Sequence, residues 1–516
     1  MTKLSVAEIF SKGMVLQRQK PIVIYGKAEK GDRISVSIYN YHGVLKDEIF
    51  TVAQADECWK ATLEAMEASI DNKIVVENTS SLETIVIEKV SVGEVWLAGG
   101  QSNMEFFNKY DQDWDKTKKL PVNEKIHFYN VPQRAFEGHV NHNGPGRDGY
   151  GKWLSDHEKG YENFSAIGYI FARKIQEKLN VPVGIIGCNW GGTTASAWVP
   201  KSVLEPVPLN QYLKEYDEAV NSIDKQELKA KSLKAWEEID APEGYKKFER
   251  FIYGEDRKTQ LEYMMSQEGA PAEVPMGPYN ENRPCGLYGT MLEKVIPYSI
   301  KGALWYQGES DAGDRAKYYD LLLKGLIDSW RSAWNDDFPF IVAQLAPFKE
   351  WLACTNDGYC LVREQQQKVA DTVKDVYLTS IMDIGNYYDI HPKEKVEVGR
   401  RMSLLALKHV YDAAGNVNAD NPRVKTTAKN EKEIVIEMDN ADNLSISGDT
   451  TLSVNVDGKT IVPESVNVTA NKVVIKMSDD ILNANSINVS MGWDDYAIIN
   501  IKNEQGLPIA PFTVAI

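Results

Sequence analysis

The middle of the chain constrains the fold most, because short apolar runs alternate there with amphipathic segments of helical length. The strand candidates are residues 94–98, 183–187, 301–305, 340–345 and 376–382. The helix candidates are residues 165–179, 318–334, 363–373 and 395–410. Alternation at this spacing predicts parallel βαβ units, and therefore a doubly wound α/β sheet.

The two ends of the chain have a different texture from the middle. The N-terminal part carries closely spaced strand-like runs without helices, which predicts a β-sandwich, and the C-terminal part returns to strands, which predicts a second β-domain. These runs are 14–17, 21–25 and 34–39, and then 433–438, 452–456, 472–477 and 486–490. We therefore predict domains at 1–92, 93–414 and 415–516. Residues from about 201 to 275, rich in Lys, Glu, Tyr and Gln, predict an insertion of surface helices that forms one wall of a cleft.

Net charge and hydropathy exclude several classes of partner. The 516 residues carry a formal net charge of −16, which disfavours binding to nucleic-acid phosphates or an anionic membrane. No apolar run reaches the roughly 18 residues that predict a membrane-spanning helix. The first residues lack the apolar core of a signal peptide, so we expect a cytoplasmic protein; the alternative is a periplasmic or secreted protein whose signal peptide has been removed.

The cysteines and histidines do not form a metal or redox motif. The five cysteines include no C-x-x-C pair, and the chain has no H-E-x-x-H sequence, EF-hand loop or Walker A loop. We therefore expect no metal and no cofactor. A disulfide between Cys354 and Cys360 is an alternative for an exported protein, but reduced thiols are the favoured prediction.

Four polar segments follow strands of the predicted sheet. Ser102 follows the first strand, residues 191–193 the second and residues 307–310 the third, while residues 389–392 lie beyond the strand that ends near 382. In open α/β sheets, ligands bind outside the carboxyl ends of the strands. The sequence therefore predicts one active site at this edge.

Ser102 and His391 are the candidates for nucleophilic catalysis. A serine hydroxyl attacks only when a base takes its proton, and histidine is the usual base near neutral pH. The alternatives are a serine that caps a helix and a surface or capping histidine. Asp389 is the candidate for holding the imidazole, and Glu309 and Asp383 compete for that role.

The other strand-end segments offer hydrogen-bond donors. Acyl transfer builds negative charge on the carbonyl oxygen, which N–H groups stabilise. Gly191 and Gly192 allow the backbone to approach a ligand closely, and Gln307 offers a side-chain amide. The alternatives are a tight turn for the glycines and a hydrogen bond at the edge of the core for Gln307.

Six motifs in this order resemble the sialate O-acetylesterase family, a branch of the SGNH hydrolases. They are Gly-Met-Val-Leu-Gln-Arg at 13–18, Gly-Glu-Val-Trp-Leu-Ala-Gly-Gly-Gln-Ser-Asn-Met at 93–104, Pro-Val-Gly-Ile-Ile at 182–186 leading into Trp-Gly-Gly-Thr at 190–193, Gly-Ala-Leu-Trp-Tyr-Gln-Gly-Glu-Ser at 302–310, Ile-His-Pro at 390–392 and Gly-Leu-Pro-Ile-Ala-Pro-Phe at 506–512. The resemblance covers nearly the whole chain. It implies a flavodoxin-like SGNH core with accessory β-sandwich domains at both ends.

The resemblance also implies roles for the site residues. Ser102 would be the nucleophile and His391 the base, with oxyanion donors from the Ser102 N–H, from the turn at 191–192, and from Gln307 in place of the usual SGNH asparagine. Many SGNH enzymes place the acid three residues before the histidine, where this chain has Tyr388. The candidates that remain are Asp389 and a Ser–His dyad steadied by a backbone carbonyl.

The implied function is that of a serine esterase which removes O-acetyl groups from sugars. Sialic acids are the first candidate substrate, as the resemblance implies. An arginine near the cleft would favour their carboxylate, and Arg283 and Arg134 are the candidates; Glu309 is either structural or faces the substrate. Esterases of xylan, mannan or xyloglucan are the alternative within the same chemistry. A non-catalytic glycan-binding protein is the alternative of another class. The expected partner is an O-acetylated sugar, with no nucleic acid and no membrane, and the oligomeric state is not indicated.

Overall fold

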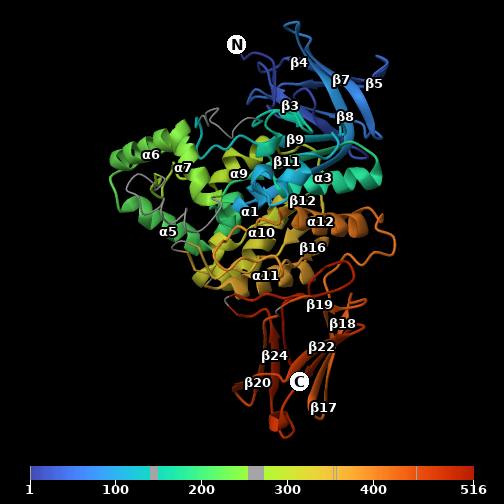
Figure 1. The fold of residues 1–516 in the computed structure, drawn as a ribbon. Coiled ribbons are helices and arrows are strands. Elements are labelled where there is room, and N and C mark those ends of the chain that lie inside the picture. Colours follow the sequence, from blue (N-terminus) through green and yellow to red (C-terminus); the bar gives the residue numbers. More distant parts are fainter. Residues whose placement is uncertain are drawn as a thin grey trace. The chain divides into compact units, whose positions relative to one another are not determined.

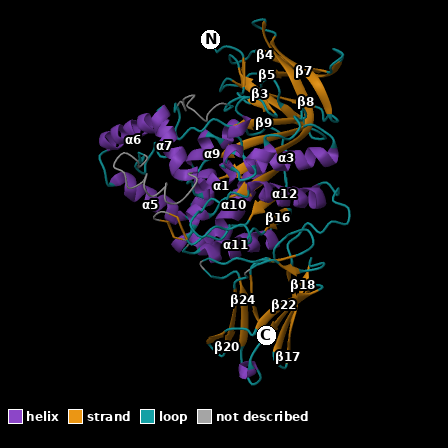
Figure 2. Cartoon of the chain, viewed as in Figure 1, coloured by secondary structure: helices purple, strands orange, loops and turns teal. Residues whose placement is uncertain are grey.

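The computed structural model describes residues 2–139, 149–253, 272–351, 354–355, 357–448, 450–494 and 496–516. The chain folds into two compact units, of which unit 1 comprises residues 1–305 and 324–340 and unit 2 comprises residues 306–323 and 341–516. Both units combine helices with sheets (Figures 1 and 2), so the predicted mixed α/β class is confirmed. No helix within the described ranges has the length and apolar character needed to cross a membrane.

Unit 1 begins with short strands. β1 (Ser5–Val6), β3 (Ile22–Lys27) and β6 (Cys58–Leu63) form a three-stranded sheet, while β4 (Arg33–Tyr39) pairs with β5 (Leu45–Val52) and β7 (Ser69–Asn78). β2 (Val15–Gln17) pairs with β8 (Glu83–Gly100). Alternate side chains of β6, namely Trp59, Ala61 and Leu63, are buried, as expected for a strand with one face in the core. The strands predicted at 14–17, 21–25 and 34–39 correspond to β2, β3 and β4.

β8 is the longest strand of unit 1, with 18 residues. Its first half pairs with β7 in antiparallel register, and its second half pairs with β11 (Val183–Asn189) in parallel register. Residues 90–100 are buried without interruption. A continuous buried run of this kind is typical of a parallel strand that is covered on both faces.

The strand order in this part of unit 1 is β10 (Trp153–Ser155), β9 (Ile126–Asn130), β11, β8 and β12 (Gly302–Tyr306). β8 comes first among the parallel strands in the sequence, yet it lies between β11 and β12. The order therefore reverses at β8, which makes its carboxyl end a topological switch point, the usual place for ligands.

Helices cover this sheet. Ser165 caps α3 (Ala166–Leu179) by accepting a hydrogen bond from the Gly168 N–H, and Phe171 of this helix contacts Trp96 of β8 at 5.0 Å between ring centroids. In α10 (Tyr319–Trp334), Trp330 packs edge-on against Trp305 at 5.6 Å. Both helices begin within one residue of their predicted start.

The described part of the predicted insertion, 201–253 and 272–275, is largely helical. It contains α4 (Lys201–Leu204), α5 (Asn210–Asn221), α6 (Lys225–Asp240) and α7 (Pro242–Tyr253). α6 buries Leu228, Ala235 and Trp236, and the Trp236 Nε1–H donates to the Tyr279 carbonyl at 2.8 Å. The prediction for residues 254–271 lies outside the described residues. The remaining short helices of unit 1 are α1 (Ser102–Glu105), α2 (Trp114–Thr117) and α9 (Gly286–Thr290).

Unit 2 contains the strands β13 (Phe340–Ala343) and β16 (Val376–Thr379) and a short hairpin of β14 (Glu350–Trp351) and β15 (Cys354–Thr355). Its main helices are α11 (Tyr359–Thr372) and α12 (Lys395–Leu405), and a π-helical turn at 406–410 continues α12. α11 starts four residues before the predicted 363. The preceding residue, Gly358, has a φ of +81°, and this turn sets the true start.

The last part of unit 2 consists of two four-stranded antiparallel sheets. Their strands, in spatial order, are β17 (Arg423–Asn430), β18 (Glu433–Asp439), β23 (Lys472–Lys476) and β22 (Ser465–Thr469), and then β21 (Lys459–Ile461), β20 (Leu452–Val456), β24 (Ile487–Met491) and β26 (Phe512–Ala515). β19 (Ser445–Ile446) pairs with β25 (Ile501–Lys502). Ile434 and Val473 from one sheet share a hydrophobic core with Val454 and Val489 from the other.

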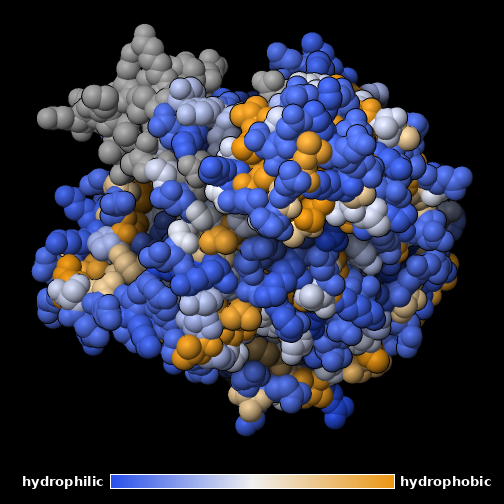
Figure 3. Space-filling model, turned by 90° about the horizontal axis from the view of Figure 1, so that it is seen from below, coloured by the Kyte–Doolittle hydropathy of each residue, from blue (hydrophilic) through white to orange (hydrophobic). Residues whose placement is uncertain are grey.

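The surface is mostly hydrophilic on the face drawn in Figure 3, and several cysteines are free thiols. Hydrophilic residues cover most of the face in Figure 3, and the hydrophobic residues on it form separate groups, which is ordinary for a protein surface. Cys58, Cys188 and Cys285 are free thiols. The Cys360 thiol donates to the Trp493 carbonyl at 3.1 Å, and the side chain of Cys354 lies outside the described residues.

Candidate active site

Ser102 is the first residue of α1 and follows β8 after one intervening residue. Gly100 has a φ of +140°, which favours glycine. A Cβ at Gly99 would lie 3.1 Å from Trp330 and 3.2 Å from Trp305. The two glycines therefore allow the chain to turn sharply beside these rings. The turn places Ser102 at the switch point, 6% exposed.

The segment after β11 packs against this serine. The Trp190 N–H donates to the Gly100 carbonyl at 3.1 Å, and a Cβ at Gly191 would lie 3.2 Å from the Ser102 Cβ. The structure therefore brings Ser102 and the 191–192 turn together, as predicted from their shared strand-end position.

Glu105 holds this segment in place, and sequence reasoning missed it. Its buried carboxylate accepts hydrogen bonds from the Gly191 N–H at 2.7 Å and from Gln133 Nε2 at 2.9 Å. Gln133 is fully buried and also donates to the Asn189 carbonyl. A carboxylate one turn after Ser102 was the available signal, but nothing in the sequence connects it with Gln133.

The two glycines of the turn differ in the state of their N–H groups. The Gly191 N–H is engaged by Glu105, whereas the Gly192 N–H donates to none of the residues that the structure describes. Gly192 is exposed and has a φ of +79°. Gly192 is therefore the member of this turn whose donor can meet a ligand.

Gln307 lies in unit 2, fully buried, directly after β12. Its Nε2 donates to Asp311 at 2.7 Å, and its Oε1 accepts from the Tyr319 hydroxyl at 2.8 Å. Gln366 donates to the Gln307 carbonyl at 3.1 Å. These bonds fix the orientation of the amide, which is the condition for a preorganised donor.

His391 lies in the loop before α12 and is 3% exposed. Its ring stands edge-on to Trp351, with 5.2 Å between the centroids. The Asp389 carboxylate accepts the backbone N–H of His391 at 2.8 Å, and the same oxygen lies 3.5 Å from Nδ1. The second distance exceeds that of a normal N–H···O hydrogen bond, so in this structure the clear contact of Asp389 is with the backbone.

The environment of His391 favours the neutral imidazole. Burial lowers the pKa of His391 below its usual value, and the charges of Lys395 and Lys393 act in the same direction. Asp389 opposes them by raising the pKa. A histidine that is neutral at pH 7 can accept a proton, as a general base must.

Asp383, one of the competing acids, is held by two cations. Its carboxylate bonds Arg401 through both oxygens at 2.7 Å and contacts Lys502 at 2.7 Å. Burial alone would raise the pKa of Asp383, but the hydrogen bonds and charges of Arg401 and Lys502 outweigh burial and lower it. Glu309 lies in a short turn, Glu309–Asp311, two residues after Gln307.

The two predicted arginines of unit 1 differ in accessibility. Arg134 forms an ion pair with Glu8 at 2.9 Å. Arg283 donates through Nε to the Pro278 carbonyl, and no carboxylate within the described ranges pairs with it. It lines a cavity of about 520 Å³ together with Lys201 and Tyr216.

A hydrogen bond links the segment that carries Arg283 to the segment that follows the 191–192 turn. Asn282, next to Arg283, accepts the Thr194 N–H at 2.8 Å, and Thr194 lies two residues after Gly192. Unit 1 therefore contains Ser102, the 191–192 turn and Arg283, whereas unit 2 contains Gln307, Glu309, Asp389 and His391.

Comparisons with known proteins define the class as carbohydrate esterase. The family described as "Carbohydrate esterase, sialic acid-specific acetylesterase" matches residues 92–236 and 278–408. These ranges cover more than half of the chain, so the chain belongs to this family and the predicted resemblance is confirmed. It is a carboxylic ester hydrolase that removes O-acetyl groups from sugars.

Individual relatives agree with this assignment. The sialate O-acetylesterase of Rattus norvegicus is 22% identical over 452 residues, covering 81% of this chain and 76% of the relative. The sialate O-acetylesterase of Homo sapiens is 23% identical over 434 residues, covering 78% and 71%. The crystal structure of a carbohydrate acetylesterase from Xanthomonas citri superposes with a TM-score of 0.73 at 22% identity, covering 99% of both chains, and therefore shares the fold.

Proposed function

We propose that this chain is a serine esterase of O-acetylated sialic acids, with an SGNH-type core at 93–414 and β-sandwich domains at 1–92 and 415–516. The observation that carries the proposal is Ser102 at the switch point of the sheet, with the 191–192 turn fixed against it by Glu105. A capping or packing serine would not require a second loop to be held beside it by a buried carboxylate.

The proposed reaction begins with proton transfer from Ser102 Oγ to His391 as Oγ attacks the acetyl carbonyl. The oxyanion is stabilised by the N–H groups of Ser102 and Gly192, and by the Gln307 amide; the Gly191 N–H stays bonded to Glu105. The sugar oxygen then leaves with the proton from His391, and acetyl-Ser102 forms. Water hydrolyses this ester by the same route and releases acetate. Asp389 orients the imidazole in this scheme.

The proposed substrate class follows from Arg283. A sialic acid carries a carboxylate, and Arg283 is a partly buried cation in a 520 Å³ cavity that no described carboxylate neutralises. Arginine binds carboxylates through two parallel hydrogen bonds, which gives geometric specificity as well as affinity. The names of the rat and human relatives point to the same substrate.

The mechanism is tested by acetate release from 4-nitrophenyl acetate and from O-acetylated N-acetylneuraminic acid. Ser102→Ala and His391→Ala should each lower kcat by about 10³-fold or more. Ser232→Ala, at a fully buried serine of α6, is the matched control and should retain turnover. Near-normal turnover by Ser102→Ala would contradict the mechanism.

The substrate is tested separately. Arg283→Met should lower kcat/KM for O-acetylated N-acetylneuraminic acid by about tenfold to a hundredfold, because a charge-assisted bond is worth about 1.5–3 kcal/mol. It should change kcat/KM for 4-nitrophenyl acetate little. An enzyme that prefers acetylated xylo-oligosaccharides, with no effect of Arg283→Met, would refute the sialic acid proposal and leave the serine mechanism intact.

A further inference from the structure

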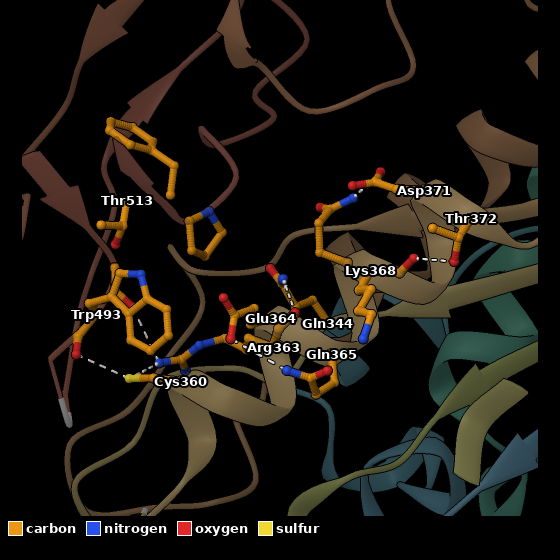
Figure 4. Close-up of a pocket in the computed structure, with 14 residues that line it drawn as sticks. Gln344, Cys360, Arg363, Glu364, Gln365, Lys368, Asp371, Thr372, Trp493 and Thr513 are labelled. Atoms are coloured by element: carbon orange, nitrogen blue, oxygen red, sulfur yellow. Dashed lines mark hydrogen bonds between the residues drawn. The ribbon is translucent and has the colours of Figure 1, made fainter. Parts of the chain in front are cut away.

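A groove of about 540 Å³ lies in unit 2, and neither Gln307 nor His391 is among the residues that line it. One wall is a face of α11, where Cys360, Glu364, Gln367, Lys368 and Asp371 recur at helical spacing. The opposite wall is formed by Trp493, after β24, and by residues 511–513 at the start of β26. Figure 4 shows the two walls facing each other, with Trp493 and Thr513 across from the helix. The volume falls within the range of about 300–1,000 Å³ that is usual for ligand pockets.

Trp493 is held in place by its backbone while its side chain remains half-buried. The Cys360 thiol donates to the Trp493 carbonyl at 3.1 Å, and Arg363 Nη2 lies 3.4 Å from the Gly492 carbonyl (Figure 4). Gly492 has a φ of +81°, and a Cβ there would lie 3.0 Å from Pro511. The turn at Gly492 thus requires glycine, and hydrogen bonds from α11 hold its backbone. This turn places the aromatic ring of Trp493 at the groove.

The charges along the groove are almost balanced. Lys368 pairs with Asp320 at 2.6 Å, and Asp371 forms a two-bond pair with Arg423 at 2.6 and 2.8 Å. Arg363 and Glu364 remain, with opposite charges, and Arg363 is only 1% exposed. The groove therefore has little net charge with which to bind a strongly charged ligand. Its amide, carboxylate and hydroxyl groups can form hydrogen bonds with an uncharged ligand.

We propose that this groove is a second saccharide subsite, which binds an uncharged sugar ring stacked on Trp493 and hydrogen-bonded to the polar face of α11. An aromatic ring beside amide and carboxylate groups matches a sugar, which has an apolar face and a rim of hydroxyls. The subsite holds an unacetylated part of the glycan while hydrolysis takes place elsewhere. This inference rests on the assignment as a carbohydrate esterase and not on the serine mechanism.

The test is isothermal titration of the full-length protein with xylotriose, mannotriose and N-acetyllactosamine, which are uncharged and carry no ester, and with 3′-sialyllactose as the charged probe. At least one uncharged probe should bind saturably. Trp493→Ala should weaken its Kd about fivefold or more. Trp493→Phe, which keeps a ring, should stay within about twofold of wild type, and Gln367→Ala should weaken binding without touching the turn. Tyr41→Ala, at an exposed ring of unit 1, is the control.

Three outcomes would overturn the proposal. They are the absence of saturable binding of every uncharged probe, an unchanged Kd for both Trp493→Ala and Gln367→Ala, and binding of 3′-sialyllactose alone. Ser102→Ala should bind the uncharged probes as wild type does, so failure of the groove and failure of the serine mechanism give different results.

Discussion

Replacing Glu105 by alanine removes an acceptor that two donors share. Gln133 is fully buried, so water cannot replace the lost bond to its amide, whereas Gly191 is partly exposed and its N–H can be hydrated. One charge-assisted hydrogen bond lost at a buried donor costs about 1.5–3 kcal/mol, and the second, hydrated donor adds less. We therefore expect Glu105→Ala to lower the free energy of unfolding by about 2–4 kcal/mol.

Glu105→Ala should also lower turnover, because it releases the 191–192 turn that packs against Ser102. A Cβ at Gly191 would stand 3.2 Å from that of Ser102, so release of this turn moves the groups beside the nucleophile. A displacement of about 1 Å at a reacting centre can cost about a hundredfold in rate. We expect kcat for 4-nitrophenyl acetate to fall about tenfold to a hundredfold in Glu105→Ala, and less in Glu105→Gln, which keeps the shape and one acceptor.

Urea unfolding and steady-state kinetics would measure both effects, with Glu177→Ala as the control at an exposed glutamate of α3. The control should shift stability by less than about 0.5 kcal/mol. An alanine variant at 105 with wild-type stability and kcat would show that the bonds to Gly191 and Gln133 do not position the turn.

Three further predictions follow from the site. The kcat/KM of the wild type should rise with pH along a limb below about pH 6.5, because burial lowers the pKa of His391 and the neutral ring is the active form. Asp389→Asn removes a group that raises the pKa of His391, so this limb should move to lower pH. A pH profile with an unmoved limb would contradict the role of Asp389. Gln307→Ala should lower kcat for 4-nitrophenyl acetate about 10²–10³-fold with little change in KM, as for other oxyanion donors, and unchanged kcat would remove Gln307 from the mechanism. Arg401→Met should lower the free energy of unfolding by about 3–5 kcal/mol in urea at neutral pH, because it leaves Lys502 as the one cation on Asp383. The pKa of Asp383 is lowered, so the stabilisation by its ionised carboxylate is present above the unfolded pKa of about 3.9 and is lost as the pH falls further. The difference in stability between Arg401→Met and the wild type should therefore shrink in acid.

Much of the fold could be predicted because the hydrophobic pattern is local. The run at 183–187 became β11 and the run at 452–456 became β20, since a strand of this kind is specified by its own side chains. β8 was predicted only over residues 94–98, although it begins at Glu83. Residues 83–89 mostly alternate between exposed and partly buried side chains, so their pairing with β7 depends on a neighbouring strand and not on an apolar run.

The site could be predicted only in part, for the same reason. Strand ends pointed to Ser102, the 191–192 turn and Gln307. The partners that fix them come from other segments, as Gln133 does for Glu105, or from the first residue of the next long helix, as Tyr319 of α10 does for Gln307. Such pairs follow from three-dimensional packing, and one sequence carries no signal for them.

The continuity of β8 limits how this chain can be divided. The strand that ends at the turn before Ser102 is the same strand that pairs with β7, and β2 pairs with its middle, from Ser91 to Gly93. A chain cut near residue 92 would divide β8 inside its pairing with β2, because Ser91 and Val92 would stay with the N-terminal piece while Gly93 would leave with the strand that pairs with β11. One continuous strand therefore crosses the proposed domain boundary at 92, and we expect truncation at that point to destabilise the remaining pieces compared with the intact chain.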